Sequence, residues 1–133
     1  MRHGRGQALL ELALCAPMIL VLGLGAVAAV QFFEAESGLQ AATDAAAAAA
    51  GRAPDAASAT GEAQKEFESI AASYPLQAAH LAIDVNGFDR GASLVVESSA
   101  VVDIAGESIA FLPAQIRLRA TATAIVEPYR SRP

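Results

Sequence analysis

Tryptophan is missing from the chain, and aromatic side chains make up only 5% of its 133 residues. Any folded core must therefore be built mainly from alanine, valine, isoleucine and leucine, within the 54% of residues that are hydrophobic. Small side chains bury little apolar area per residue, so such a core is marginal by itself. The length and composition predict one small domain, or a small domain attached to an anchor.

Cysteine and histidine are also scarce. Cys15 is the only cysteine, so the chain cannot form an internal disulfide. His80 has no cysteine or second histidine near it in the sequence, which argues against a zinc site. No motif places a nucleophilic side chain on a tight turn. We therefore predict a protein that is not an enzyme and that has no metal, no cofactor and no small-molecule substrate.

The chain also lacks an excess of basic residues. The chain has 14 acidic and 9 basic residues, with a formal net charge of −5. Nucleic-acid phosphates require a basic surface, so a nucleic-acid partner is not expected. The same balance argues against a polybasic surface that binds anionic lipid headgroups.

A long uncharged run is the main feature that is present. Leu12 to Phe33 is 22 residues without a charge. As a helix this run would be about 33 Å long, enough to cross a hydrocarbon layer of roughly 30 Å. A soluble helix would need a polar face, and the run has none. The sequence therefore predicts a single transmembrane helix.

The flanks of the run predict its orientation. Arg2 and Arg5 precede it, whereas Glu34 and Glu36 follow it. Positive residues tend to remain on the cytoplasmic side of a membrane. We expect the N-terminus in the cytoplasm and the residues after Phe33 outside it.

A cleaved secretory signal peptide is one alternative for this segment. Ala26 and Ala28 offer a cleavage site of small residues, and the basic start fits. The length of the run, and its interruption by Glu11 and Pro17, argue against it. Under this alternative the product is a small secreted binding module.

A glycine-rich string inside the run has two further interpretations. Gly23-Leu24-Gly25-Ala26-Val27-Ala28 matches a dinucleotide-binding fingerprint, with Asp44 near the expected distance. The rest of the chain lacks the strand–helix alternation that a parallel sheet requires. We favour a helix-packing contact at Gly25 and Ala29, where small residues one turn apart allow a second helix to approach closely.

Glu11 stands near the start of the apolar run, where an unpaired carboxylate is costly. Taken alone, it could lie in the headgroup region without a partner. Its neighbours form the pattern Arg5-Gly6-Gln7-Ala8-Leu9-Leu10-Glu11, which resembles the processing site of type IV prepilins. The stretch from Arg5 to Leu14, with Pro17 after it, resembles the TadE-like pseudopilins of tight-adherence (Flp) pilus systems. This resemblance is sharp over residues 5–40 and only architectural beyond them.

The resemblance implies a role for each matching position. Gly6 would be the last leader residue recognised by a prepilin peptidase, and Gln7 would become the new N-terminus, open to methylation. Glu11 would meet the free amine of a neighbouring subunit during assembly, because pairing offsets the cost of burying both charges. Leu12 replaces the aromatic residue of many relatives, and Gln7 replaces the phenylalanine of many type IV pilins. These departures favour a minor subunit.

The function implied is that of a structural subunit of a pilus or a related secretion assembly. Its partners would be the prepilin peptidase, other pilin or pseudopilin subunits and the assembly platform. Its location would be the bacterial inner membrane, with the C-terminal domain periplasmic or extracellular. An unprocessed bitopic protein that anchors something else is a further alternative, in which replacing Glu11 would have no effect.

The domain organisation follows from helix and turn signals. We expect a leader at residues 1–6, a transmembrane and stem helix at 7–50, a linker at 51–60, and an extracytoplasmic α+β domain at 61–133. The alanine run that ends at Ala50 favours a continuous helix, and Gly51 and Pro54 signal its end.

The outer domain is predicted to hold a short helix and a three-stranded antiparallel sheet. The helix is expected at residues 61–73. Apolar residues then alternate with polar ones near residues 81–85, 94–104 and 115–127, which predicts strands with one apolar face. The short helix or the stem must cover that face. Ile109, Phe111 and Leu112 are expected in a loop that fills the core or forms a contact, and Arg117 and Arg119 on the solvated face.

Overall fold

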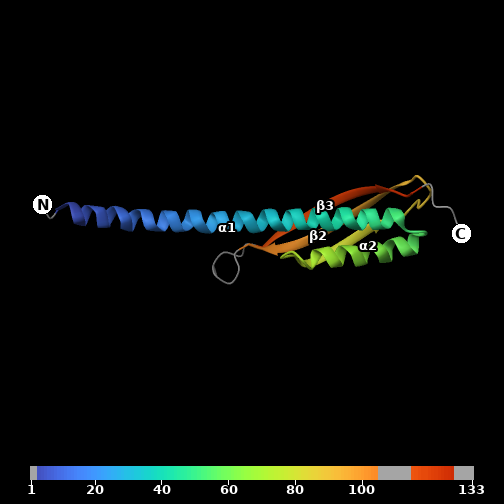
Figure 1. The fold of residues 1–133 in the computed structure, drawn as a ribbon, viewed down its shortest axis with the longest axis horizontal. Coiled ribbons are helices and arrows are strands. Elements are labelled where there is room, and N and C mark those ends of the chain that lie inside the picture. The colour runs from blue at the N-terminus through green and yellow to red at the C-terminus, as the bar shows by residue number, and fades with distance from the viewer. Residues whose placement is uncertain (1–2, 105–114, 128–133) are drawn as a thin grey trace.

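The computed structural model describes residues 3–104 and 115–127, which form two helices and three strands (Figure 1). Their bounds are α1 His3–Arg52, α2 Ala56–Ala71, β1 Gln77–Asp84, β2 Ser93–Asp103 and β3 Gln115–Ile125. The sheet has the order β1-β2-β3, and both strand pairs are antiparallel. The α+β class with a long N-terminal helix, a short second helix and a three-stranded sheet is confirmed.

Helix α1 is one continuous element of 50 residues and passes through Pro17 without ending. At 1.5 Å per residue it is about 75 Å long. Its first half extends beyond the rest of the molecule, and its second half lies beside the sheet and α2 (Figure 1). The projecting first half and the folded domain therefore share a single helix.

Helix α2 starts earlier than the sequence pattern predicted. It begins at Ala56, within the stretch expected to be a linker, and ends at Ala71. Asp55 is the reason, because its side chain caps the helix by accepting a hydrogen bond of 2.8 Å from the backbone N–H of Ser58. Gly61 lies inside the helix at an exposed position. Only residues 53–55 connect the two helices.

The three strands differ in regularity. The β2–β3 ladder runs without a register shift from Ser93 opposite Ile125 to Asp103 opposite Gln115. The β1–β2 ladder is irregular near its start, where Ala78 has a φ of 47°. Irregularity of this kind is one way in which edge strands avoid unwanted pairing.

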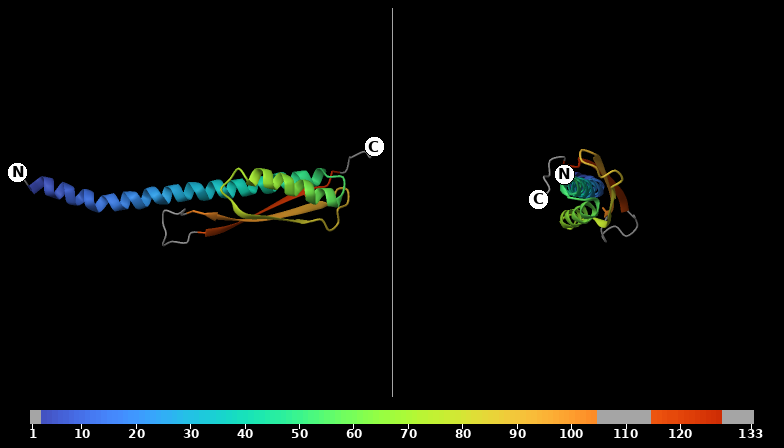
Figure 2. Two further views of the ribbon diagram at one scale, coloured as in Figure 1. Left: turned by 90° about the horizontal axis from the view of Figure 1, so that it is seen from below. Right: turned by 90° about the vertical axis from the view of Figure 1, so that its right-hand side faces the viewer.

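Both helices cover one face of the sheet (Figure 2). Helix α1 lies against β2 and β3, and α2 packs beside α1. Alternate residues of β2 are buried, as the period-two pattern predicted. Phe67, Leu39 and Leu94 are the largest of the fully buried side chains. Ile116, predicted for the core face, is 39% exposed because it lies near the end of β3.

Two contacts fix how the layers align. Thr43 of α1 and Ser98 of β2 are buried, and their hydroxyl oxygens are 2.5 Å apart. Gly38 of α1 lies against the ring of Tyr74, so closely that a Cβ added at Gly38 would collide with it. The predicted loop contact by Ile109, Phe111 and Leu112 falls outside the described residues.

Candidate functional site

The first half of α1 is apolar and uncovered. We call residues 4–30 the projecting segment. From Gly4 to Val27 every residue is exposed, and only Ala28 in the segment is half-buried. Large apolar side chains cover it on all sides; Leu12, Leu20 and Leu22 are 63%, 63% and 73% exposed. Monomeric soluble proteins rarely expose a continuous apolar surface of this extent.

The projecting segment is long and apolar enough to cross a membrane. None of its most apolar stretch is buried against another described part of the chain, unlike the core helix of a soluble protein. By contrast, burial begins at Ala35 and continues along α1 through Leu39, Ala42 and Ala46. The same helix therefore changes its surroundings within about two turns.

The residues expected at a processing and assembly site all lie in the projecting segment. Gly6 and Gln7 are exposed and helical, close to the start of α1 at His3. Glu11 is exposed one turn further along, on the same face as Gln7. Its carboxylate has no hydrogen-bond or ion-pair partner among residues 3–104 and 115–127. A negative charge within an otherwise apolar surface is thus left available to a group from another molecule.

The small residues Gly25 and Ala29 are exposed on successive turns. A Cβ added at Gly25 would meet nothing within 4 Å, so the surface there is open. The whole string from Gly23 to Ala28 is helical. A dinucleotide fingerprint needs a strand, a tight turn and then a helix, so this alternative is excluded.

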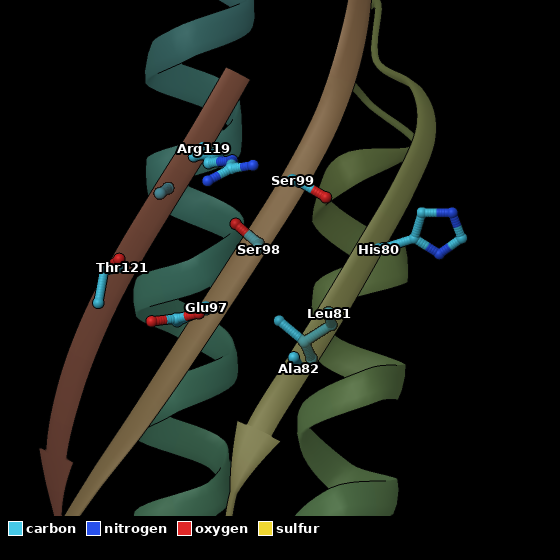
Figure 3. Close-up of a pocket in the computed structure, with 9 residues that line it drawn as sticks. His80, Leu81, Ala82, Glu97, Ser98, Ser99, Arg119 and Thr121 are labelled. Atoms are coloured by element: carbon cyan, nitrogen blue, oxygen red, sulfur yellow. The ribbon is translucent and has the colours of Figure 1, made fainter. Parts of the chain in front are cut away.

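A second feature lies on the face of the sheet that points away from the helices, here called the outer face. A shallow groove of about 490 Å³ crosses all three strands. His80 and Ser99 pair across β1 and β2, and Ser99 and Arg119 pair across β2 and β3. Arg119 extends from β3 toward β2, whereas His80 points away at the β1 edge (Figure 3). Glu97 and Thr121 complete the polar lining.

The sequence placed Arg119 on the solvated side of its strand but did not reveal this groove. The groove depends on strand register, which joins residues far apart in the chain. Within the described part of the chain, no group of three or more histidine, cysteine, aspartate or glutamate side chains could hold a metal ion. The groove is open to solvent, and its lining comes from all three strands.

Comparison with protein-family models, curated proteins and solved structures gives no significant match. The function must therefore be inferred from the chain's own chemistry and geometry.

Charge is unevenly distributed over the described elements. Strand β3 contains Arg117 and Arg119 and no acidic residue. The two helices and the other two strands each contain more acidic than basic residues. Neither arginine has a side-chain hydrogen bond or ion pair within the described ranges. The outer face of β3 is thus a basic strip on an acidic molecule, with Glu97 of β2 beside it on the same face.

Proposed function

We propose that this chain is a membrane-anchored minor pilin, a TadE-like pseudopilin that acts as a structural subunit of a pilus or related secretion assembly. The observation that carries the proposal is the division of α1. Its first half exposes apolar side chains in every direction, and its second half forms the core of a small α+β domain. A helix built this way holds a domain at a fixed orientation above a membrane.

The charged residues of the projecting segment support an assembly role. After cleavage behind Gly6, the amine of Gln7 would lie one turn from Glu11 of its own chain. In a bundle of such helices, a shift of one subunit would bring that amine to the Glu11 of a neighbour. Each charge costs several kcal/mol when buried alone, so pairing between subunits would favour one stagger.

The remaining parts of the proposal are the prepilin peptidase as processing partner and the bacterial inner membrane as the location. The N-terminus would face the cytoplasm, because Arg5 precedes the apolar run and Glu34 and Glu36 follow it. The open surface around Gly25 and Ala29 would allow close approach of a second helix.

The test is expression of the full chain in membranes together with a prepilin peptidase. We expect a membrane-bound product whose N-terminus, determined by mass spectrometry, is Gln7. Glu11→Ala should still insert and be processed, but its cross-linked multimers should fall at least about tenfold, since several kcal/mol of pairing is lost and about 1.4 kcal/mol already gives a factor of ten. Glu34→Ala is the matched control, because Glu34 is exposed on the same helix beyond the apolar run. A different mature N-terminus, or equal assembly of both variants, would contradict the proposal.

A secreted module with a cleaved signal peptide is the second candidate, and one observation favours it. Every buried core residue lies at or beyond Ala35, so cleavage near Ala28 would leave the core intact. Fractionation separates the two candidates. A soluble product that starts near Ala29 supports the module, whereas a membrane-bound product supports the pilin. An intact bitopic anchor would be membrane-bound but uncleaved, and indifferent to Glu11→Ala.

A further inference from the structure

The basic strip on β3 and the acidic surface of α2 lie on opposite sides of the molecule. Arg117 and Arg119 are exposed on the outer face of the sheet. Helix α2 packs on the other side and exposes Glu62, Glu66 and Glu68. Figure 2, viewed along α1, shows the helices and the strands as two separate layers. The two charged surfaces therefore cannot meet within one chain.

The height of Arg119 can be measured along α1 from the buried contacts. Thr43 touches Ser98, and Ser98 pairs with Ala120, the neighbour of Arg119. Thr43 is five residues beyond Gly38, or about 7 Å along the helix. Arg119 is one strand residue, about 3 Å, back toward the membrane end. Arg119 thus stands about 4 Å beyond Gly38.

The height of the α2 carboxylates follows in the same way. Tyr74 touches Gly38, and α2 runs antiparallel to α1 from that point. Glu68 precedes Tyr74 by six residues, which places it about 9 Å beyond Gly38. Arg119 and Glu68 therefore differ in height by about 5 Å, a gap that two long side chains can span.

Two copies anchored in one membrane share one orientation, and before the shift that pairs a Gln7 amine with a neighbouring Glu11 they stand at the same height. Side-by-side packing of the sheet of one copy on the helical layer of the next would bring Arg119 level with Glu68, whereas Glu66 lies on the other flank of α2. This contact joins two different surfaces, and repetition of such a contact builds a ring or a filament. Opposite charges at matching heights determine the register of an interface more than they increase its affinity.

We propose that the outer face of β3, through Arg117 and Arg119, docks on the acidic face of α2 of a second copy of this chain. The inference rests on the proposed function, because membrane anchoring is what aligns the two copies. The open groove beside Arg119, of about 490 Å³, receives side chains of the neighbouring helix. The regular β2–β3 ladder presents the strip as a flat surface, unlike the irregular β1 edge.

Disulfide cross-linking in membranes tests the arrangement directly. Two full-length chains are co-expressed, both with Cys15→Ala. One carries Thr121→Cys on the outer face of β3, and the other carries Ser69→Cys on the exposed side of α2. Each chain has a single cysteine, so any disulfide between positions 121 and 69 joins two copies. Glu62→Cys is the matched control for Ser69→Cys, because it is exposed on the same side of α2, two turns and about 10 Å further from the membrane end.

We expect a heterodimer for the 121/69 pair and little or none for the 121/62 pair. Adding Arg119→Glu to the first chain should lower the heterodimer at least about fivefold, because the facing charges then repel. Adding Glu66→Arg and Glu68→Arg to the second chain should restore it, which also shows that the variants fold. Arg90→Glu, in the turn at the far end of the sheet, makes the same charge change and should have no effect.

Failure of this inference is distinguishable from failure of the proposed function. If wild-type multimers form and depend on Glu11 but the 121/69 heterodimer is absent, the docking contact is wrong and the pilin proposal stands. If Arg119→Glu lowers the heterodimer and the α2 reversal does not restore it, the contact is again overturned. Reduced binding of that variant to phosphatidylglycerol vesicles would then assign the arginines to lipid. If no wild-type multimers form in the membrane, both proposals fall.

Discussion

At the scale of single residues, the buried hydroxyl pair in the core has a defined proton order. Thr43 Oγ1 donates to the carbonyl oxygen of Leu39, one turn earlier, at 2.6 Å. A hydroxyl has only one proton, so the contact with Ser98 must be a bond that Ser98 donates to Thr43. Thr43 is therefore donor and acceptor at once, whereas Ser98 depends on Thr43 for its partner.

This order predicts an asymmetry between two substitutions. Thr43→Val leaves the Ser98 hydroxyl buried without an acceptor and should cost about 1–3 kcal/mol of unfolding free energy. Ser98→Ala leaves Thr43 bonded to Leu39 and should cost less. The double variant should be more stable than Thr43→Val alone, because no orphaned hydroxyl remains. Denaturant unfolding of all four proteins in detergent measures this cycle, and a larger cost for Ser98→Ala than for Thr43→Val would contradict this proton order.

Residue-scale contacts of this kind are not visible in the sequence. Gly38 and Tyr74 are 36 positions apart, and the residues around them give no indication that they are in contact. The period-two alternation did place Ser98 on the core face of its strand. It could not identify Thr43 as the partner of Ser98, because that contact depends on how α1 packs across the sheet.

At the scale of elements, the strands were predictable because one face of the sheet is buried and the other is solvated. This arrangement imposes strict alternation, and β2 shows it along its length. The start of α2 was missed because its first turns contain small residues that resemble a linker. The signal that would have found it is Asp55 with Ser58 three residues later, a cap in which a side chain satisfies an otherwise free backbone N–H.

The cap at Asp55 predicts a dependence of stability on pH. The hydrogen bond from the backbone N–H of Ser58, with a second from its hydroxyl, lowers the pKa of Asp55 below its ordinary value of 3.8. A depressed folded-state pKa means that the stabilisation is present above pH 3.8 and is lost as the pH falls through the folded-state pKa.

Asp55→Asn keeps an acceptor oxygen but cannot titrate. The stability difference between wild type and Asp55→Asn should therefore be constant near neutral pH and should shrink below pH 3.8, whereas Asp55→Ala should be less stable than Asn at every pH. Thermal unfolding followed by circular dichroism across this range is the measurement. A difference that does not change with pH would show that the Asp55 charge adds nothing to the cap.

At the scale of the whole molecule, a core built from small side chains accounts both for the scarcity of aromatic residues and for the close packing of the two helices. Where α1 and α2 meet, the buried residues are mostly alanine, with Ala42, Ala46 and Ala50 on one helix and Ala59 and Ala63 on the other. Small side chains let two helices approach closely. The core between the helices therefore holds little apolar side-chain volume, and much of the chain's apolar content lies instead in the projecting segment. The sequence predicted that separation from an uninterrupted apolar run, but the groove and the charged surfaces required the assembled layers.

The separation of the projecting segment from the core predicts that the domain folds without residues 1–30. Deletion of residues 1–30 removes none of the buried core residues, which begin at Ala35. The remaining fragment should be soluble, and its unfolding free energy should lie within about 0.5 kcal/mol of the full chain in detergent, since only exposed residues are lost. Deletion of residues 1–40 removes Ala35 and Leu39 and should cost at least about 2–5 kcal/mol, the range for truncating one buried leucine.

Size-exclusion chromatography with denaturant unfolding distinguishes these fragments. A first fragment that is unfolded would place part of the stabilising contacts inside the projecting segment. A second fragment that is as stable as the first would show that Ala35 and Leu39 add nothing to the core. The docking contact adds a further expectation for the first fragment. Without a membrane to align copies at one height, it should be monomeric at micromolar concentration, because exposed charge pairs alone contribute too little to hold two proteins together.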